Sequence, residues 1–271
     1  MLTRRCGVLG SPIAHSLSPV MHRAAYAALG LDWRYDAYEV DEAALTGFVA
    51  GLDASWRGLS LTMPLKRVVL PLLDDVSETV RETGAANTVL LDEGRLSGDN
   101  TDVPGIVAAL AERGVSRVTS AVIVGAGATA ESTVAALRRI GLVSVRLLVR
   151  DPGRAEHLRE RAAAAGVAVV VAPLDDAWIT DDADLAVSTV PAAALAEHAD
   201  ALAGADAVFD AIYDPWPTPL TEAARAGGRA VVTGVDLLAH QAVRQVSLMT
   251  GRDVPVDVLR DPAQAALGSR P

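Results

Sequence analysis

The sequence predicts an α/β protein with two domains, and three observations support this prediction. The chain has 271 residues, about 1.8 times a typical domain of ~150 residues. Short apolar runs alternate with helix-like stretches along its whole length. From Ser120 onward the apolar runs lose polar alternation, which indicates a parallel sheet covered by helices on both faces.

The composition is that of a globular protein with a large buried core. Hydrophobic residues make up 51% and charged residues 21% of the chain, and the net charge is −10. This charge argues against nonspecific nucleic-acid binding, which needs clustered lysine and arginine. The longest apolar runs stay below the ~18 residues of a membrane span. We therefore expect a cytoplasmic protein that binds neither nucleic acid nor membrane, as a monomer or a homodimer.

The first hundred residues predict a mixed α/β arrangement. Ser18 is expected to be the N-cap of a helix with Pro19 at its first position, and Gly30 ends that helix. The only cysteine, Cys6, is expected to be a buried strand thiol. Expected strands are 6–9, 35–40 and 58–62, with a hairpin of 86–91 and 95–97 around 92–94. Expected helices are 18–28, 42–51, 68–73 and 77–83.

Turn-forming residues at 98–105 predict a domain boundary, followed by a helix to Arg113. The strands expected after it are 121–124, 143–149, 167–171, 185–188, 208–210 and 230–233. An amphipathic helix over 237–250 follows, and we expect it to return to the first domain with the rest of the chain. The predicted domains are 1–102 completed by 238–271, with a mixed sheet, and 103–237, with a cleft between them.

A glycine-rich turn separates the strand 121–124 from a helix expected over 131–140. It has the pattern G-x-G-x-x-A in the strand–turn–helix setting of dinucleotide-binding folds. Its residues are Gly125, Ala126, Gly127, Ala128, Thr129 and Ala130. Such a turn brings a pyrophosphate to a helix N-terminus, so the second domain is predicted to be Rossmann-like.

The next strand ends at Val149, where such folds recognise the adenosine ribose. Arg150 and Arg154 favour the 2′-phosphate of NADP, whereas an acid at Asp151 favours NAD. Asp151 is followed by Pro152, and this pair also suits a helix N-cap. We therefore predict NADP and keep NAD as the alternative.

Lys66 is the only lysine among 24 basic residues. An ammonium group can release a proton, whereas a guanidinium stays protonated. Lys66 follows the end of an expected strand, although a solvated surface charge is the simpler interpretation of a lone lysine. The polar residues expected around it suit proton exchange with a polyhydroxylated substrate. They are Ser60, Thr62, Asn87, Thr88 and Asp102. A short-chain reductase would have tyrosine at position 62, so threonine there argues against that class.

Six ordered motifs resemble those of the shikimate dehydrogenase family, and together they extend over nearly the whole chain. They lie at 10–19, 61–66, 84–88, 98–102, 210–215 and 234–241. The resemblance implies reversible NADPH-dependent reduction of 3-dehydroshikimate to shikimate, in the biosynthesis of chorismate and the aromatic amino acids. Lys66 would be the acid/base group and Asp102 its partner, and no metal is implied.

The resemblance also implies roles for further residues. The substrate carboxylate would be bound by Ser16, Ser18 and Tyr213. The ring hydroxyls would be held by Thr62, Asn87, Asp102 and Gln241. The pyrophosphate of the cofactor would lie against Gly125, Ala126, Gly127, Ala128 and Thr129. Its 2′-phosphate would be bound by Arg150 and Arg154, and its nicotinamide would lie near Gly234.

The chain departs from the family pattern at three positions. Ser60 stands where asparagine is usual, Ala128 replaces a second consecutive glycine, and Val149 stands where asparagine often occurs. Two alternatives to this function stay open, the first of them because of Asp151. One is an NAD-preferring quinate/shikimate or aminoshikimate dehydrogenase, and the other is a non-catalytic sensor of a shikimate-like ligand.

Overall fold

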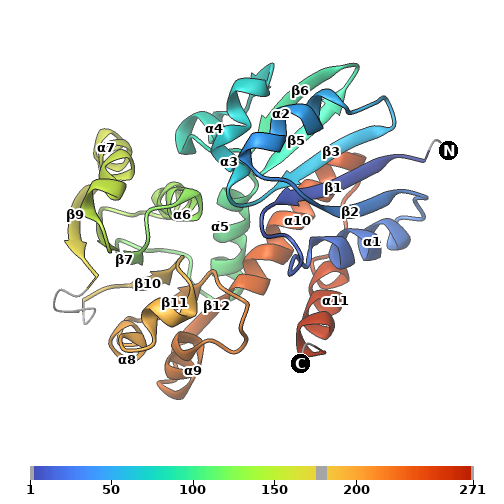
Figure 1. Cartoon of the computed structure of the whole chain (residues 1–271). Helices are drawn as coiled ribbons and strands as arrows, with labels where there is room; N and C mark the ends of the chain where they lie inside the picture. The colour runs from blue at the N-terminus through green and yellow to red at the C-terminus, as the bar shows by residue number, and fades with distance from the viewer. Residues whose placement is uncertain (1–2, 175–181, 270–271) are drawn as a thin grey trace. The chain divides into compact units, whose positions relative to one another are not determined.

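The computed structural model describes residues 3–174 and 182–269, shown in Figure 1. These residues form two compact units. Unit 1 contains the described residues of 1–105 and 238–271, and unit 2 contains those of 106–237. The chain passes between them within two helices, α5 (Asp102–Glu112) and α10 (Gly234–Thr250). Residues 102–105 are therefore helical, and the expectation of a turn over all of 98–105 is wrong there.

Unit 1 is built on a six-stranded mixed sheet with the strand order β2-β1-β3-β5-β6-β4. Its strands are β1 (Arg5–Gly10), β2 (Arg34–Glu39), β3 (Trp56–Leu61), β4 (Asp75–Val76), β5 (Thr88–Asp92) and β6 (Arg95–Asp99). β1 lies parallel to β2 and β3, and β5 lies antiparallel to β3 and β6. The predicted hairpin is confirmed: Glu93 and Gly94 form its tip, both with positive φ, as a tight turn between twisted strands requires.

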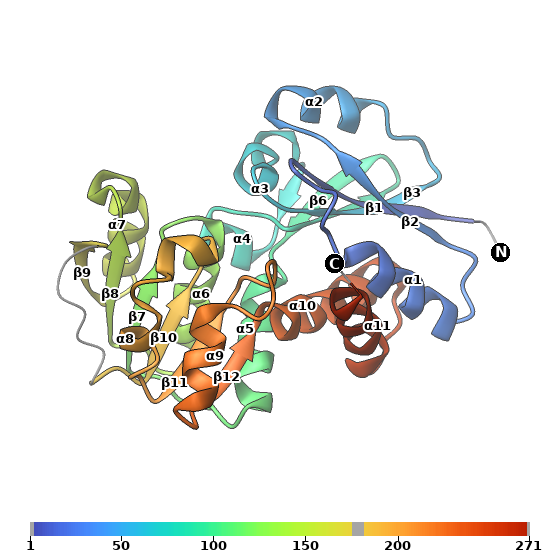
Figure 2. The ribbon, with the colours of Figure 1, turned by 60° about the horizontal axis from the view of Figure 1, so that its bottom comes forward.

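The helices of unit 1 begin close to their predicted positions. They are α1 (Ser18–Ala28), α2 (Glu42–Ala50), α3 (Leu65–Val68), η1 (Leu70–Leu72), α4 (Glu78–Thr83) and α11 (Asp257–Gly268). Figures 1 and 2 show α11 alongside α1. The expectation that Ser18 is an N-cap is wrong, because Leu17 already has helical backbone angles and Ser18 is the first helical residue. The hydroxyl oxygen of Ser16 instead accepts from the Ser18 N–H at 3.3 Å.

The core of unit 1 contains Cys6, which packs with Tyr26, Tyr35 and Met249. Cys6 is 1% exposed, and burial raises the pKa of its thiol to about 11. The thiol is therefore protonated at neutral pH and is a poor nucleophile. The prediction of a buried strand thiol is confirmed.

His22 is buried against Tyr35, with the two rings stacked at a centroid distance of 3.9 Å. Its Nδ1 lies 3.0 Å from the carbonyl oxygen of Ser18 and therefore donates to it. Burial lowers the pKa of His22 to about 4, whereas an unfolded histidine has a pKa of about 6.5. The unfolded chain thus binds more protons between these two pH values. The free energy of unfolding should fall by up to about 3 kcal/mol as the pH drops from 6.5 to 4.

The substitution His22→Asn should remove this part of the pH dependence, because an asparagine amide can donate to the Ser18 carbonyl but does not titrate. Urea unfolding of both proteins at about pH 7 and about pH 4.5 measures the effect. Wild type should lose more stability on acidification than the variant. Equal losses in the two proteins would show that His22 does not contribute.

Unit 2 is built on six parallel strands with the order β12-β11-β10-β7-β8-β9. The strands are β7 (Ser120–Val124), β8 (Ser144–Val149), β9 (Ala168–Pro173), β10 (Leu185–Ser188), β11 (Ala207–Asp210) and β12 (Ala230–Thr233). This is the strand order of a doubly wound dinucleotide-binding sheet. The predictions of a parallel sheet and a Rossmann-like fold are confirmed.

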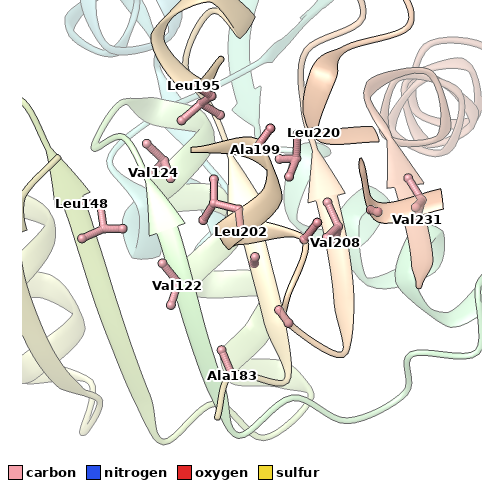
Figure 3. Close-up of a cluster of buried hydrophobic side chains, with 14 of the residues drawn as sticks. Val122, Val124, Leu148, Ala183, Leu195, Ala199, Leu202, Val208, Leu220 and Val231 are labelled. Carbon is pink, nitrogen blue, oxygen red and sulfur yellow. The ribbon is translucent and has the colours of Figure 1, made fainter. Parts of the chain in front are cut away.

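Helices and apolar strand residues together form the core of unit 2. Its helices are α6 (Ala128–Arg139), η2 (Pro152–Ala155), α7 (Glu156–Ala164), η3 (Ala192–Leu195), α8 (Ala199–Leu202) and α9 (Pro219–Ala226). Figure 3 shows Val122 and Val208 of the strands near Leu202 and Leu220 of the helices, all buried. Helix α6 begins at Ala128 rather than at the expected Glu131, because the extended backbone of Gly127 makes that residue the N-cap.

Candidate active site

The carboxyl ends of β1 and β3 position the segments around Lys66. These parallel neighbours end at Gly10 and Leu61. The Thr62 N–H donates to the Leu9 carbonyl at 2.9 Å, and the Ser11 N–H donates to the Met63 carbonyl at 3.0 Å. A side chain on Gly10 would place its Cβ 2.3 Å from Thr62 Cγ2. Because Gly10 has no side chain, the segment that follows it toward Ser16 can leave the sheet next to the turn that carries Thr62 and Lys66.

Lys66 and Asp102 form an ion pair at this end of the sheet. The Lys66 Nζ donates to Asp102 Oδ2 at 2.7 Å. The two side chains are 15% and 7% exposed, so the pair is largely removed from water. Lys66 also fixes the neighbouring chain, because its carbonyl accepts from the Ala86 N–H at 2.8 Å. The ammonium is thus held by one carboxylate on a short, well-packed turn.

Asn87 forms a hydrogen bond with the other carboxylate oxygen of Asp102. Its Nδ2 donates to Asp102 Oδ1 at 2.8 Å, and it lies 3.0 Å from Thr101 Oγ1 and 3.3 Å from Gln241 Oε1. Its Oδ1 accepts from the Thr101 N–H and from the Thr88 hydroxyl, each at 2.8 Å. Asn87 is 2% exposed. The amide therefore holds the carboxylate through Oδ1, while Lys66 pairs with Oδ2.

Gln241 reaches this group because α5 and α10 approach closely within unit 1. A Cβ on Gly105 would lie 2.9 Å from the Cβ of Gln241 and from its backbone nitrogen. The side-chain amide of Gln241 is oriented by donation to the Leu238 carbonyl at 2.9 Å. Lys66, Asp102, Asn87 and Gln241 therefore form one contiguous polar cluster.

The serines expected to bind a carboxylate follow β1. The Ser16 N–H donates to the Ile13 carbonyl at 3.0 Å, and the Ser16 side chain is half-buried. Ser18 is buried at the start of α1, and its carbonyl oxygen accepts from His22 Nδ1 at 3.0 Å. Tyr213, expected to assist them, belongs to unit 2, in the loop after β11.

The glycine-rich turn of unit 2 contains two glycines that are needed for different reasons. Gly125 has a φ of +107°, and its Cβ would lie 2.3 Å from Thr189 Oγ1, so packing within the protein requires glycine there. A Cβ on Gly127 would meet no described atom within 4 Å. Among the described residues no side chain caps α6. Its first-turn N–H groups thus suit an anion, and Gly127 leaves room for it.

The segment after β8 confirms that Asp151 has a structural role. Its side chain is the N-cap of η2 and accepts from the Gly153 N–H at 3.0 Å. Arg150 and Arg154 are exposed. Within residues 3–174 and 182–269, neither guanidinium has a hydrogen-bond or ion-pair partner. Two exposed cations are therefore available for a phosphate at the place where the sequence predicts one.

Gly234 lies against the loop that carries Tyr213. Its Cβ would come within 2.5 Å of the Ala211 carbonyl oxygen, so only glycine fits. Asp210 stabilises the same loop by accepting from the Thr218 hydroxyl at 2.6 Å and from the Ile212 N–H at 3.1 Å. Burial raises the pKa of Asp210. Unit 2 thus fixes both ends of the segment from Asp210 to Thr218.

Several of these residues were missed by the sequence analysis. Thr101 and Asp210 lie inside the motifs quoted above, which was the available signal for them. Gln245 lies one helical turn after Gln241, and this spacing places both side chains on one helix face. No comparable sequence signal marks Tyr35.

Residues 3–174 and 182–269 contain no group of three or more His, Cys, Asp or Glu side chains that could hold a metal ion. None of the helices in this part of the chain is both long and apolar enough to cross a membrane.

Comparison with known proteins gives a consistent result. Residues 8–89 match the family model of the shikimate dehydrogenase substrate binding domain, and residues 234–261 match that of the shikimate 5′-dehydrogenase C-terminal domain. The shikimate dehydrogenase (NADP(+)) of Rubrobacter xylanophilus is 40% identical over 270 residues, covering 95% of this chain and 94% of that protein.

Two solved structures show the same likeness in three dimensions. The shikimate dehydrogenase of Mycobacterium tuberculosis has a TM-score of 0.89 at 36% identity, covering 97% of this chain and 99% of that one. The Thermus thermophilus enzyme in complex with NADP(H) and shikimate has a TM-score of 0.84 at 34% identity, covering 98% and 100%. With this identity over nearly its full length, the chain belongs to the family of NADP-dependent shikimate dehydrogenases.

Proposed function

We propose that this chain interconverts 3-dehydroshikimate and shikimate with NADP(H), using Lys66 as the acid/base group and Asp102 as its partner. The observation that carries this proposal is the 2.7 Å ion pair between the two side chains, which lie in a largely buried polar cluster. An ammonium held in this way can donate a proton to a substrate oxygen and recover it later.

Substrate binding is assigned to neutral hydrogen-bonding groups. Ser16 and Ser18 lie at the N-terminal end of α1, where the Ser16 hydroxyl oxygen already accepts from the Ser18 N–H at 3.3 Å. The positive end of the helix dipole adds to the two hydroxyls in attracting a carboxylate, and Tyr213 is proposed as a third donor. Thr62, Asn87 and Gln241 are proposed to hold the ring hydroxyls.

The proposed proton transfer uses the geometry of the ion pair. NADPH, when bound, supplies the hydride that reduces the ketone carbon. Negative charge then develops on the ketone oxygen, where an N–H donor stabilises it. Lys66 Nζ donates its proton to this oxygen, which becomes the hydroxyl of shikimate, and the neutral amine regains a proton from water. Asp102 orients the ammonium through Oδ2, and Asn87 keeps Asp102 in place through Oδ1.

Cofactor binding is assigned to unit 2. The turn from Gly125 to Thr129 is proposed to take the pyrophosphate, Arg150 and Arg154 the 2′-phosphate, and Gly234 to lie near the nicotinamide. The open space beside Gly127 and the two exposed guanidiniums support this assignment.

The proposal is tested by kcat/KM for shikimate and for quinate, each with NADP⁺ and NAD⁺. Shikimate with NADP⁺ should be preferred by about 100-fold or more over each alternative, a difference of about 3 kcal/mol. The double variant Arg150→Ala, Arg154→Ala should lose most of the cofactor discrimination, whereas Arg159→Ala, which breaks only an ion pair with Glu156 within α7, should retain it. A preference for NAD⁺ or quinate, or shikimate binding without turnover, would overturn the proposal.

A further inference from the structure

A buried row of hydrogen bonds extends from Tyr35 to Asn87 inside unit 1. The Tyr35 hydroxyl lies 2.6 Å from Ser60 Oγ, and Ser60 Oγ lies 2.8 Å from Gln245 Oε1. These three side chains come from β2, β3 and α10 and are 0%, 4% and 1% exposed. The function proposed above assigns no role to any of them. Burying so many polar groups is costly unless every one is hydrogen-bonded.

Gln245 connects this row to the acid/base pair through two neighbouring residues. Its Nε2 lies 2.9 Å from the Thr88 hydroxyl and 3.2 Å from the Asn87 carbonyl oxygen. The Thr88 hydroxyl in turn lies 2.8 Å from Asn87 Oδ1. Since Asn87 Nδ2 donates to Asp102, the row is continuous from Tyr35 to the carboxylate that holds Lys66.

The direction of each hydrogen bond is fixed by chemistry. The Asn87 carbonyl can only accept, so the amide nitrogen of Gln245 must face it, and the Gln245 oxygen must face Ser60. Ser60 therefore donates to Gln245 and accepts from Tyr35. The Thr101 N–H can only donate, so Asn87 must turn its oxygen toward it and its nitrogen toward Asp102. Every bond in the row thus points toward the Asp102 carboxylate, and aligned hydrogen bonds strengthen one another.

We propose that Gln245, supported by Ser60 and Tyr35, is a positioning residue for the reaction. It holds Asn87 in one orientation, and Asn87 in turn holds Asp102 Oδ2 against Lys66. This inference rests on the proposed function. It also explains Ser60, which stands where asparagine is usual in the family, because both hydrogen-bonding directions of its hydroxyl are used by Tyr35 and Gln245.

The test compares Gln245→Met, which keeps the length of the side chain but removes its hydrogen bonds, with Arg244→Ala, its exposed neighbour on α10. Gln245→Met should lower kcat for shikimate oxidation about 10–100-fold and leave KM for NADP⁺ within about twofold. Thr88→Val removes one hydroxyl and serves as the variant to use if Gln245→Met fails to fold. Tyr35→Phe, at the far end of the row, should lower kcat by only a few-fold.

A double-mutant cycle separates positioning from a general loss of stability. In an Asn87→Ala background, Gln245→Met should change kcat by less than about twofold, because its effect acts through Asn87. An equal loss in both backgrounds, or a wild-type kcat for Gln245→Met, would overturn the inference.

A readout that needs no turnover distinguishes this inference from the proposed function. In ¹⁵N spectra, the side-chain amide signals of Asn87 should shift in Gln245→Met and stay unchanged in Arg244→Ala. A wild-type protein that fails to oxidise shikimate would overturn the proposed function, and these spectra would still test whether Gln245 fixes Asn87. Unchanged Asn87 signals in Gln245→Met would show that it does not.

Discussion

Replacing Lys66 with arginine is expected to lower kcat for shikimate oxidation by about 10²–10⁴-fold, the usual contribution of a positioned acid/base group. Arginine keeps the positive charge and can still pair with Asp102, but its guanidinium does not release a proton. The variant therefore separates the two roles that an ammonium could have at this place. Charge stabilisation would survive the substitution in part, whereas proton transfer would not.

The measurement is the rate of NADPH formation at saturating shikimate and NADP⁺. Arg67→Ala is the matched control, because Arg67 is exposed in the same turn and is expected to leave kcat unchanged. Lys66→Arg should unfold at nearly the wild-type urea concentration. The loss of kcat would then come from the missing proton transfer and not from unfolding. A kcat within tenfold of wild type for Lys66→Arg would exclude proton transfer by Lys66.

Replacing Gly127 with valine is expected to weaken NADPH binding by at least about 100-fold, or about 3 kcal/mol. Gly127 has ordinary extended backbone angles, and a Cβ there would meet no described atom within 4 Å. The folded protein therefore tolerates a side chain, but the pyrophosphate proposed to lie over this turn does not. Affinity should fall with little change in stability.

Gly125→Ala is the informative comparison for this prediction. Its positive φ and the 2.3 Å approach to Thr189 Oγ1 mean that alanine strains the protein itself, so stability and affinity should both fall. Titration of NADPH fluorescence gives the dissociation constants, and urea unfolding gives the stabilities. An unchanged NADPH affinity in Gly127→Val would mean that the pyrophosphate binds elsewhere.

Most strands of the two sheets could be predicted, because most are short apolar runs bounded by turn-forming residues, whereas the two-residue strand β4 (Asp75–Val76) was missed. Helix starts were less predictable, since they depend on backbone angles that the residue type does not determine. Ser18 is an excellent N-cap by composition, yet Leu17 before it is already helical. Asp102 follows a cluster of turn formers, yet it begins α5.

The same distinction applies to the candidate site. Lys66, Asp102 and Asn87 lie in local motifs, so their residue types and spacing indicated them. The hydrogen bonds from Tyr35 to Ser60 and from Ser60 to Gln245 join residues 25 and 185 positions apart. The pairing of β2 and β3 with β1 brings Tyr35 to Ser60, and the packing of α10 on this sheet brings Gln245 to both. Gly234 shows another limit of prediction from sequence, because nothing in the sequence indicates that this residue packs closely against the Ala211 carbonyl.

Unit 1 is made of two stretches of the chain separated by the whole of unit 2. This arrangement determines the order in which the site is completed during synthesis. A nascent chain that has reached Leu237 contains every residue of unit 2, but it still lacks the last segment of unit 1. Gln241 and Gln245 therefore leave the ribosome more than 130 positions after Asp102, a delay of about 7–28 s at ~5–20 residues per second. Until then Asn87 lacks its hydrogen bonds to Gln241 and Gln245, so the polar cluster around the acid/base pair is completed only after unit 2 has been synthesised.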